Sequence, residues 1–130
     1  MCLSDKHIVL YFYPRDNTPG CTMQSISFQD ARAKFHRAGA RVFGISRDTL
    51  TSHKRFANKY GLQFPLIADP EETICKMFGV MKEKTMFGKK VRGIQRSTFV
   101  IDKRGVLLKE WRKVKVPGHV DEVLTFVKTL

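Results

Sequence analysis

The sequence predicts an α/β protein whose mixed central sheet is flanked by helices on both faces. Three observations predict this class. Apolar runs typical of strands alternate with segments in which apolar residues recur at helical spacing. Glycine or proline punctuates the chain between most of these segments, as expected where regular elements end. The last two strand-like runs flank a short turn signal, which adds an antiparallel pair to an otherwise alternating order.

The N-terminal half is expected to begin with a buried strand. Residues 8–13 are six consecutive apolar residues, β-branched or aromatic, with charge before them and proline after them. From Cys21 to about Ala38, apolar residues recur at helical spacing, and Gly39 supplies a stop. The further elements of this half are a strand over 41–46 and a helix over 51–60, which Gly61 ends.

The C-terminal half is expected to contain three strands and two helices. In chain order these are a strand over 64–68, a helix over 70–78, strands over 98–101 and 106–111, and a helix over 120–130. Asp102-Lys103-Arg104-Gly105, between the last two strands, is a hairpin turn signal. The final helix is amphipathic, because Val120, Val123, Leu124 and Val127 share one face.

Size and composition indicate a globular protein. The 130 residues are expected to form one domain, 1–130, large enough for a core without disulfides, and the 42% hydrophobic content with ten Phe excludes a disordered chain. No apolar run approaches the ~20 residues that span a bilayer, and the first residues lack the apolar core of a secretory signal. Three irregularly spaced cysteines suit a reducing compartment, so we expect a cytoplasmic protein.

Cys21 is the most informative residue of the chain. It follows Pro14-Arg15-Asp16-Asn17-Thr18-Pro19-Gly20, which forces a tight turn after the first strand and delivers the cysteine to the first turn of the next helix. Free N–H groups and the helix dipole favour an anion there, and the thiolate is the nucleophilic form of cysteine. The other interpretation is a small apolar residue packed beneath a loop. The surrounding turn favours the reactive interpretation.

The spacing Pro14-x-x-x-Thr18-x-x-Cys21 resembles the active-site motif of the peroxiredoxins, and the fuller string 11–22 is similar to their Q-type branch, the bacterioferritin comigratory proteins. Four further segments resemble that branch in the same order: Gly44–Asp48, Phe64–Asp69, Phe78–Val80 and Gly93–Asp102. The resemblance therefore covers essentially the whole chain from Ile8 onward. It implies a thioredoxin-like fold and a thiol-dependent peroxidase that reduces hydrogen peroxide and organic hydroperoxides without a cofactor. Members of the branch carry a β-hairpin before the first strand; Leu3-Ser4-Asp5 resembles its tail end, so we expect the hairpin to be missing here.

The resemblance also implies roles for four residues. Cys21 is the peroxidatic nucleophile, and the Thr18 hydroxyl can bond both the thiolate and the peroxide, although a helix N-cap is an equally ordinary role for threonine. Arg96, in the segment 93–97, is the cation that stabilises the thiolate and donates to the leaving oxygen. Among 24 Lys and Arg, nothing but this segment singles it out. Pro14 is expected to shield the cysteine from water, and it also ends the strand.

Attack on a peroxide would leave Cys21 as a sulfenic acid, which another thiol must reduce. Many Q-type members carry a resolving cysteine five residues later, where this chain has Ile26, and others carry it in the following helix, where this chain has Ala57. We therefore expect one-cysteine chemistry, with thioredoxin, glutaredoxin or glutathione as the external reductant. Cys75 is a candidate resolving residue, with a buried core residue as the other interpretation. Cys2 is interpreted as an incidental thiol near the terminus.

The net charge of +12 is unevenly distributed, since residues 82–115 hold twelve Lys and Arg against three acidic residues. Such a stretch suits a nucleic acid or an acidic partner, but it carries no nucleic-acid-binding motif, and we expect no specific nucleic acid. A redox-inactive thioredoxin-fold interaction module is the other alternative, against which intact Thr18 and Cys21 argue. The four histidines show no ligand spacing with the cysteines, so no metal is expected. From the resemblance we expect a monomer, and from the lack of a long apolar run we expect no membrane partner.

Overall fold

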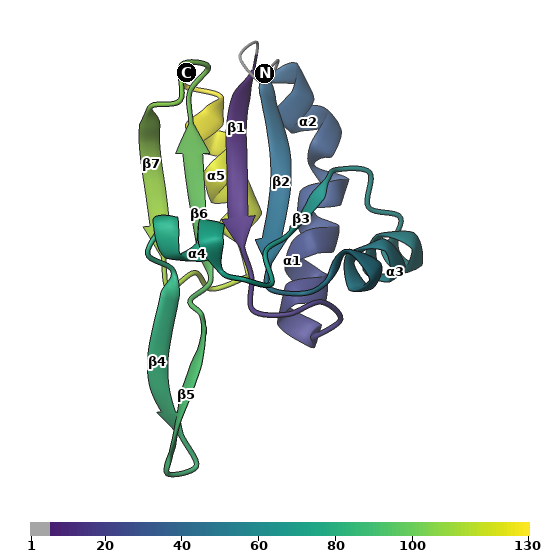
Figure 1. The fold of residues 1–130 in the computed structure, drawn as a ribbon. Coiled ribbons are helices and arrows are strands. Elements are labelled where there is room, and N and C mark those ends of the chain that lie inside the picture. The colour runs from purple at the N-terminus through teal and green to yellow at the C-terminus, as the bar shows by residue number, and fades with distance from the viewer. Residues whose placement is uncertain (1–5) are drawn as a thin grey trace.

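A five-stranded mixed sheet organises residues 6–130, the part of the chain that the computed structural model describes. Its strands, in spatial order, are β3 (Leu66–Ala68), β2 (Ala40–Ser46), β1 (His7–Phe12), β6 (Ser97–Ile101) and β7 (Leu107–Arg112) (Figure 1). The first three are parallel to one another, whereas β6 runs antiparallel to both β1 and β7. This topology confirms the predicted α/β class and its mixed sheet.

Helices cover both faces of the sheet, as predicted, but unequally. One face packs against α1 (Pro19–Asp30), α2 (Arg32–Arg37), α3 (Leu50–Tyr60) and α5 (His119–Val127). The short helix α4 (Thr73–Met77) packs on the other face. Successive side chains of β1 point to opposite faces of the sheet. Tyr11 therefore packs on the face covered by the four helices, and Phe12 packs on the face covered by α4.

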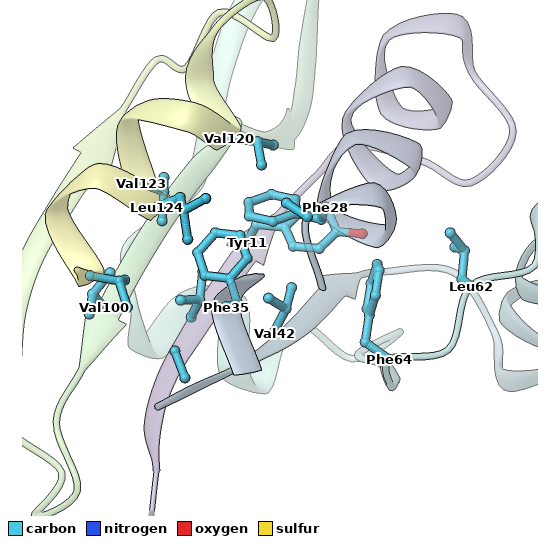
Figure 2. Packing of buried hydrophobic residues seen from close by; sticks show 14 of the residues in the cluster. Tyr11, Phe28, Phe35, Val42, Leu62, Phe64, Val100, Val120, Val123 and Leu124 are labelled. Atoms are coloured by element: carbon cyan, nitrogen blue, oxygen red, sulfur yellow. The ribbon is translucent and has the colours of Figure 1, made fainter. Parts of the chain in front are cut away.

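The larger hydrophobic cluster is built on aromatic rings around β1. Tyr11 stacks on Phe28 with ring centroids 4.5 Å apart and meets Phe64 edge-on at 5.9 Å. Phe28 in turn packs against Phe35 of α2 at 5.9 Å. Figure 2 shows the apolar face of α5 turned toward these rings, through Val120, Val123 and Leu124. Burying a side chain of this size stabilises the fold by about 1.5–3 kcal/mol, so this cluster holds the helices to the sheet.

The smaller cluster lies on the opposite face. Phe99 of β6 meets Phe12 edge-on at 5.5 Å and Phe78 at 4.9 Å, so the end of α4 is held against the sheet. The other buried members are Ile45, Cys75, Val80 and Ile94.

Some predicted boundaries differ from the structure. The helix expected over 21–38 begins at Pro19, which suits a first helical turn, and it is interrupted at Ala31, where φ is −91° and ψ is 0°. The apolar spacing survives this break, because Phe28 and Phe35 both remain buried. Gly61 ends α3 as predicted, in the left-handed region at φ 64°. Among the described residues, no helix is both long and apolar enough to cross a bilayer.

One element was not predicted at all. β4 (Met81–Met86) and β5 (Lys89–Ile94) form a separate two-stranded antiparallel sheet that extends away from the main body (Figure 1). Most of its side chains are exposed, so the sequence lacks the alternation of apolar and polar residues that predicts a half-buried strand. Its turn is Phe87-Gly88, with φ of 52° and 77°, and not one of the usual Asn-Gly or Asp-Gly signals.

Candidate active site

Cys21 lies at the third position of α1, at the end of the sheet where β1 terminates. Thr18 adopts the extended backbone of an N-cap residue (φ −87°, ψ 152°), and the helix begins at Pro19. The cysteine is therefore in the first turn, as predicted, and its side chain is fully buried against the larger cluster. Helix N–H groups without intrahelical partners surround this position and favour a negative charge.

Arg96 reaches Cys21, as expected from the resemblance. Its Nη2 donates to the cysteine sulfur at 3.3 Å. The sheet register explains the approach, because Phe12 at the end of β1 pairs with Ser97 at the start of β6, which places Arg96 beside the loop that follows β1. Gly20 leaves the necessary room, since a Cβ there would lie 3.3 Å from the same nitrogen.

Gln24 completes the contacts of the guanidinium and was missed by the sequence analysis. Its Oε1 accepts from Arg96 Nη1 at 2.6 Å, so the two arms of the arginine fork bind Gln24 and Cys21. The side chain is fully buried, and its Nε2 has no hydrogen-bond partner among residues 6–130. The only signal in the sequence is spacing: a residue three positions after Cys21 lies on the same helix face.

Thr18 makes a different hydrogen bond from the one expected, whereas Pro14 lies where the strand was expected to end. The Thr18 hydroxyl donates to the carbonyl of Arg15 at 3.0 Å, and it makes no hydrogen bond to the cysteine sulfur or to the helix N–H groups in the described part of the chain. Its oxygen lone pairs therefore stay available to accept a hydrogen bond. Pro14 follows directly after the last apolar residue of the β1 segment and is itself exposed.

A buried polar network anchors the loop that carries the motif, and no spacing rule predicted it. The carboxylate of Asp16 accepts from the Tyr13 hydroxyl at 2.6 Å and from the Ser52 hydroxyl at 2.8 Å. Its other neighbour is His53 Nδ1 at 2.8 Å, and the opposite ring nitrogen lies 3.0 Å from the carbonyl oxygen of Ile67. The active-site loop is thereby tied to α3 and β3.

Burial and hydrogen bonding act in opposite directions on Asp16. Burial alone would raise the pKa of its carboxyl, but the hydrogen bonds from His53, Tyr13 and Ser52 outweigh it and hold that pKa below its ordinary value. Burial likewise raises the pKa of Tyr13 far above its ordinary value, so its hydroxyl remains a neutral donor. The network is thus fully formed at neutral pH.

Part of this network also has the composition of a metal site. Ligand atoms of Asp16, Asp48 and His53 lie within 4.8 Å of one another. These carboxylates are already engaged, however, since Asp48 Oδ2 accepts from the Asp16 N–H at 2.8 Å and from the Ser46 hydroxyl at 2.5 Å. Hydrogen bonds within the protein account for the grouping.

Cys75 does not lie near Cys21. It is fully buried in the smaller cluster, on the opposite face of the sheet. Burial, followed by the carboxylate of Asp69, raises the pKa of its thiol to about 12, so little thiolate forms at neutral pH. The structure thus supports its interpretation as a core residue. Ile26 and Ala57, at the usual resolving positions, are partly buried in α1 and α3. Cys2 lies outside the described residues, as do residues 3–5, which were expected to be the tail end of the missing hairpin.

Comparisons of the sequence and of the structure with known proteins point to one family. Residues 2–109 match the model of the AhpC/TSA family. Peroxiredoxin Bcp of Xanthomonas campestris is 49% identical over 121 residues, which cover 93% of this chain and 76% of the relative. Peroxiredoxin Bcp of Bacillus subtilis is 48% identical over 125 residues, covering 96% and 80%. A solved structure of the Xanthomonas campestris bacterioferritin comigratory protein, studied for alkyl peroxide reduction, superposes with a TM-score of 0.92 at 46% identity, covering 96% of this chain and 80% of that one.

Proposed function

The chain belongs to the AhpC/TSA family as a thiol-dependent peroxidase of the Bcp/Q type, and from this we propose that Cys21 is its peroxidatic nucleophile and that an external thiol recycles it. The observation that carries the proposal is the 3.3 Å contact between Arg96 Nη2 and the Cys21 sulfur in the first turn of α1. Arg96 thus places a permanent cation and a hydrogen-bond donor directly beside this sulfur.

The peroxide step follows from this geometry. The Cys21 thiolate attacks one peroxide oxygen, the S–O bond forms, and the O–O bond breaks. The departing oxygen keeps the bonding pair and takes up a proton, leaving as water or an alcohol. Arg96 donates to this oxygen as its charge develops, and Thr18 accepts from the peroxide O–H, because its own hydrogen is held by Arg15. Cys21 is buried, whereas Arg96 and Thr18 are partly exposed.

Recycling requires a second sulfur. The two positions where Q-type members hold a resolving cysteine are Ile26 and Ala57, and Cys75 lies across the sheet with a raised pKa. An external thiolate therefore attacks the sulfenic sulfur of Cys21, which forms a mixed disulfide and releases water. A second external thiol then restores Cys21 and leaves as the oxidised disulfide.

Mass spectrometry after one equivalent of hydrogen peroxide, without added thiol, tests both parts of the proposal. We expect a sulfenic or sulfinic acid on Cys21 and an unmodified Cys75. Cys21→Ser should lose peroxide turnover while keeping the fold, and Cys75→Ser is the matched control that should keep turnover. Turnover retained by Cys21→Ser would refute the nucleophile. A Cys21–Cys75 disulfide at full yield would refute one-cysteine recycling.

We propose that thioredoxin, glutaredoxin or glutathione is the reductant and that the chain acts as one domain and as a monomer. Both hydrophobic clusters share one sheet, which supports the single domain. A reducing compartment such as the cytoplasm suits free thiols at Cys21 and Cys75. We propose that its partners include no specific nucleic acid and no membrane.

A further inference from the structure

The β4–β5 ribbon is a cationic arm, and on one of its faces every charged residue is basic. It carries five basic residues and one acidic residue, Glu83; the basic ones are Lys82, Lys84, Lys89, Lys90 and Arg92. Cross-strand pairing places Lys82 opposite Gly93 and Lys84 opposite Val91, on the face that Lys89 shares. The acid pairs with Arg92 on the other face. Three lysines thus project on one side of the ribbon without a neutralising residue among them.

Phe87, at the tip, serves neither the turn nor the core. Its side chain is 99% exposed, so it contributes no burial to the fold. Its φ of 52° is a conformation that costs a non-glycine residue roughly 1 kcal/mol or more, and Asn would suit this position before Gly88 far better. A large apolar side chain kept at a strained, fully exposed position has the chemistry of an anchor for a binding partner.

The base of the ribbon is held firmly, so the arm is preorganised. Arg92 forms an ion pair with Glu72, which also accepts from Arg47 Nη1 at 3.1 Å. The N–H of Gln95 donates to the Val80 carbonyl at 2.7 Å and closes the ribbon where it meets the sheet. A partner that binds such an arm loses little affinity to ordering it.

The arm and the reactive sulfur lie at the same end of the sheet, where β1 terminates and β6 begins. β5 ends at Ile94 and the chain reaches Arg96 two residues later, where the guanidinium contacts Cys21. The six residues of β5 alone span about 20 Å at 3.3 Å per residue. A tripeptide thiol such as glutathione spans at most about 11 Å, so it cannot touch Cys21 and Phe87 together. Only a protein can use the whole arm while reducing this sulfur.

We propose that the β4–β5 ribbon is the docking arm for an acidic thiol protein that reduces oxidised Cys21, with Lys82, Lys84 and Lys89 binding acidic side chains and Phe87 anchoring in an apolar recess of the partner. The proposal rests on external-thiol recycling of Cys21. A nucleic acid would also be attracted by these lysines, but it delivers no thiol to the neighbouring sulfur. Charge reversal at such a surface changes association rates by about tenfold or more, and the effect weakens with salt.

The test compares turnover driven by thioredoxin, glutaredoxin, glutathione and the uncharged reductant dithiothreitol. The charge variant is Lys82→Glu/Lys84→Glu. Its matched control is Lys103→Glu/Arg104→Glu, which changes the net charge equally in the turn between β6 and β7, at the opposite end of the sheet (Figure 1). We expect the ribbon variant to lose about tenfold or more in kcat/KM with the protein reductant, within twofold of the parent with dithiothreitol, and the control to match the parent with both.

Phe87→Asn tests the role of Phe87 independently of the lysines. Asn-Gly is a favourable hairpin turn, so this variant should keep the ribbon intact. Its thermal stability should equal or exceed that of the parent, whereas its kcat/KM with the protein reductant should fall. A purely structural role for Phe87 would give the opposite stability result.

The outcomes separate the two proposals. Absence of dithiothreitol-driven turnover in the parent would overturn the proposed function and the docking role with it. Parent-like thioredoxin and glutaredoxin kinetics in the ribbon variant would overturn the docking role alone, as would turnover with glutathione but with neither protein. Binding of a DNA duplex that is lost in the ribbon variant, with protein-driven turnover unchanged, would reassign the arm to nucleic acid.

Discussion

Replacing Arg96 separates the charge of the guanidinium from its geometry. In the structure one arm of the fork donates to Cys21 at 3.3 Å and the other to Gln24 at 2.6 Å. Lysine keeps the charge, but its single ammonium cannot reproduce this planar two-armed arrangement. Alanine removes charge and donors together.

The expected magnitude follows from the bond that is lost. A hydrogen bond involving a charged group contributes about 1.5–3 kcal/mol, and each 1.36 kcal/mol in the barrier is tenfold in rate. We therefore expect Arg96→Ala to lower the second-order rate of Cys21 oxidation by about ten- to one-hundred-and-fifty-fold. Arg96→Lys should fall near the lower end of that range, about tenfold, because the ammonium still stabilises the thiolate.

The assay is stopped-flow oxidation of reduced protein by hydrogen peroxide, without recycling thiol, so that only the peroxide step is measured. Arg104→Ala is the matched control, because this arginine lies in the distant turn after β6, and it should react like the parent. Thermal denaturation of each variant shows whether the fold is intact. If folded Arg96→Ala reacts as fast as the parent, another cation activates the sulfur and the assignment of Arg96 is wrong.

Three further predictions follow from contacts around the same loop. Gly20→Ala should place a Cβ 3.3 Å from Arg96 Nη2 and displace the guanidinium by a few tenths of an ångström. Since a misplacement of 1 Å costs about a hundredfold in rate, the rate of Cys21 oxidation should fall roughly fourfold. An unchanged stopped-flow rate would contradict this. Asp16→Asn removes the carboxylate that accepts from Tyr13 and Ser52 and should cost about 1.5–3 kcal/mol in the free energy of unfolding by urea, with parent-like stability as the contrary result. Because the folded pKa of Asp16 is lowered, its stabilisation is present above its unfolded pKa near 3.9 and is lost as pH falls through the folded value. Thermal midpoints measured from pH 6 to pH 2.5 should therefore fall less steeply below about pH 4 in Asp16→Asn than in the parent, and equal slopes would argue against the network.

Most of the fold could be predicted because most elements carry a local signal. Six consecutive apolar residues over 8–13 indicate a buried strand, and Gly61 marks the end of α3. The ribbon of β4 and β5 could not be predicted in the same way, because exposed strands keep no apolar alternation. Its turn is Phe87-Gly88, where Asn-Gly or Asp-Gly is usual. Residues that disagree with the local structural preference are expected at functional sites, which agrees with the proposed binding role.

In the candidate site, too, local features could be predicted from the sequence, whereas contacts between distant segments could not. The helix-start position of Cys21 is a local property that turn residues impose, and the structure confirms it. Gln24 was missed because its role exists only once Arg96 arrives from a distant part of the chain. The network around Asp16 joins three elements and has no fixed spacing at all.

By itself, the sequence determined the elements, the mixed α/β class and the place of the thiol, since propensity, periodicity and turn chemistry act over a few neighbouring residues. No local pattern tells which of 24 Lys and Arg meets Cys21; the resemblance named Arg96, and only the tertiary structure brings it to the sulfur, through the register of β1 with β6. It also decided that Cys75 lies across the sheet from Cys21, which depends on how α4 packs and not on the residues beside it. Contacts between distant segments follow from packing and strand register, and no local pattern encodes these for a single residue.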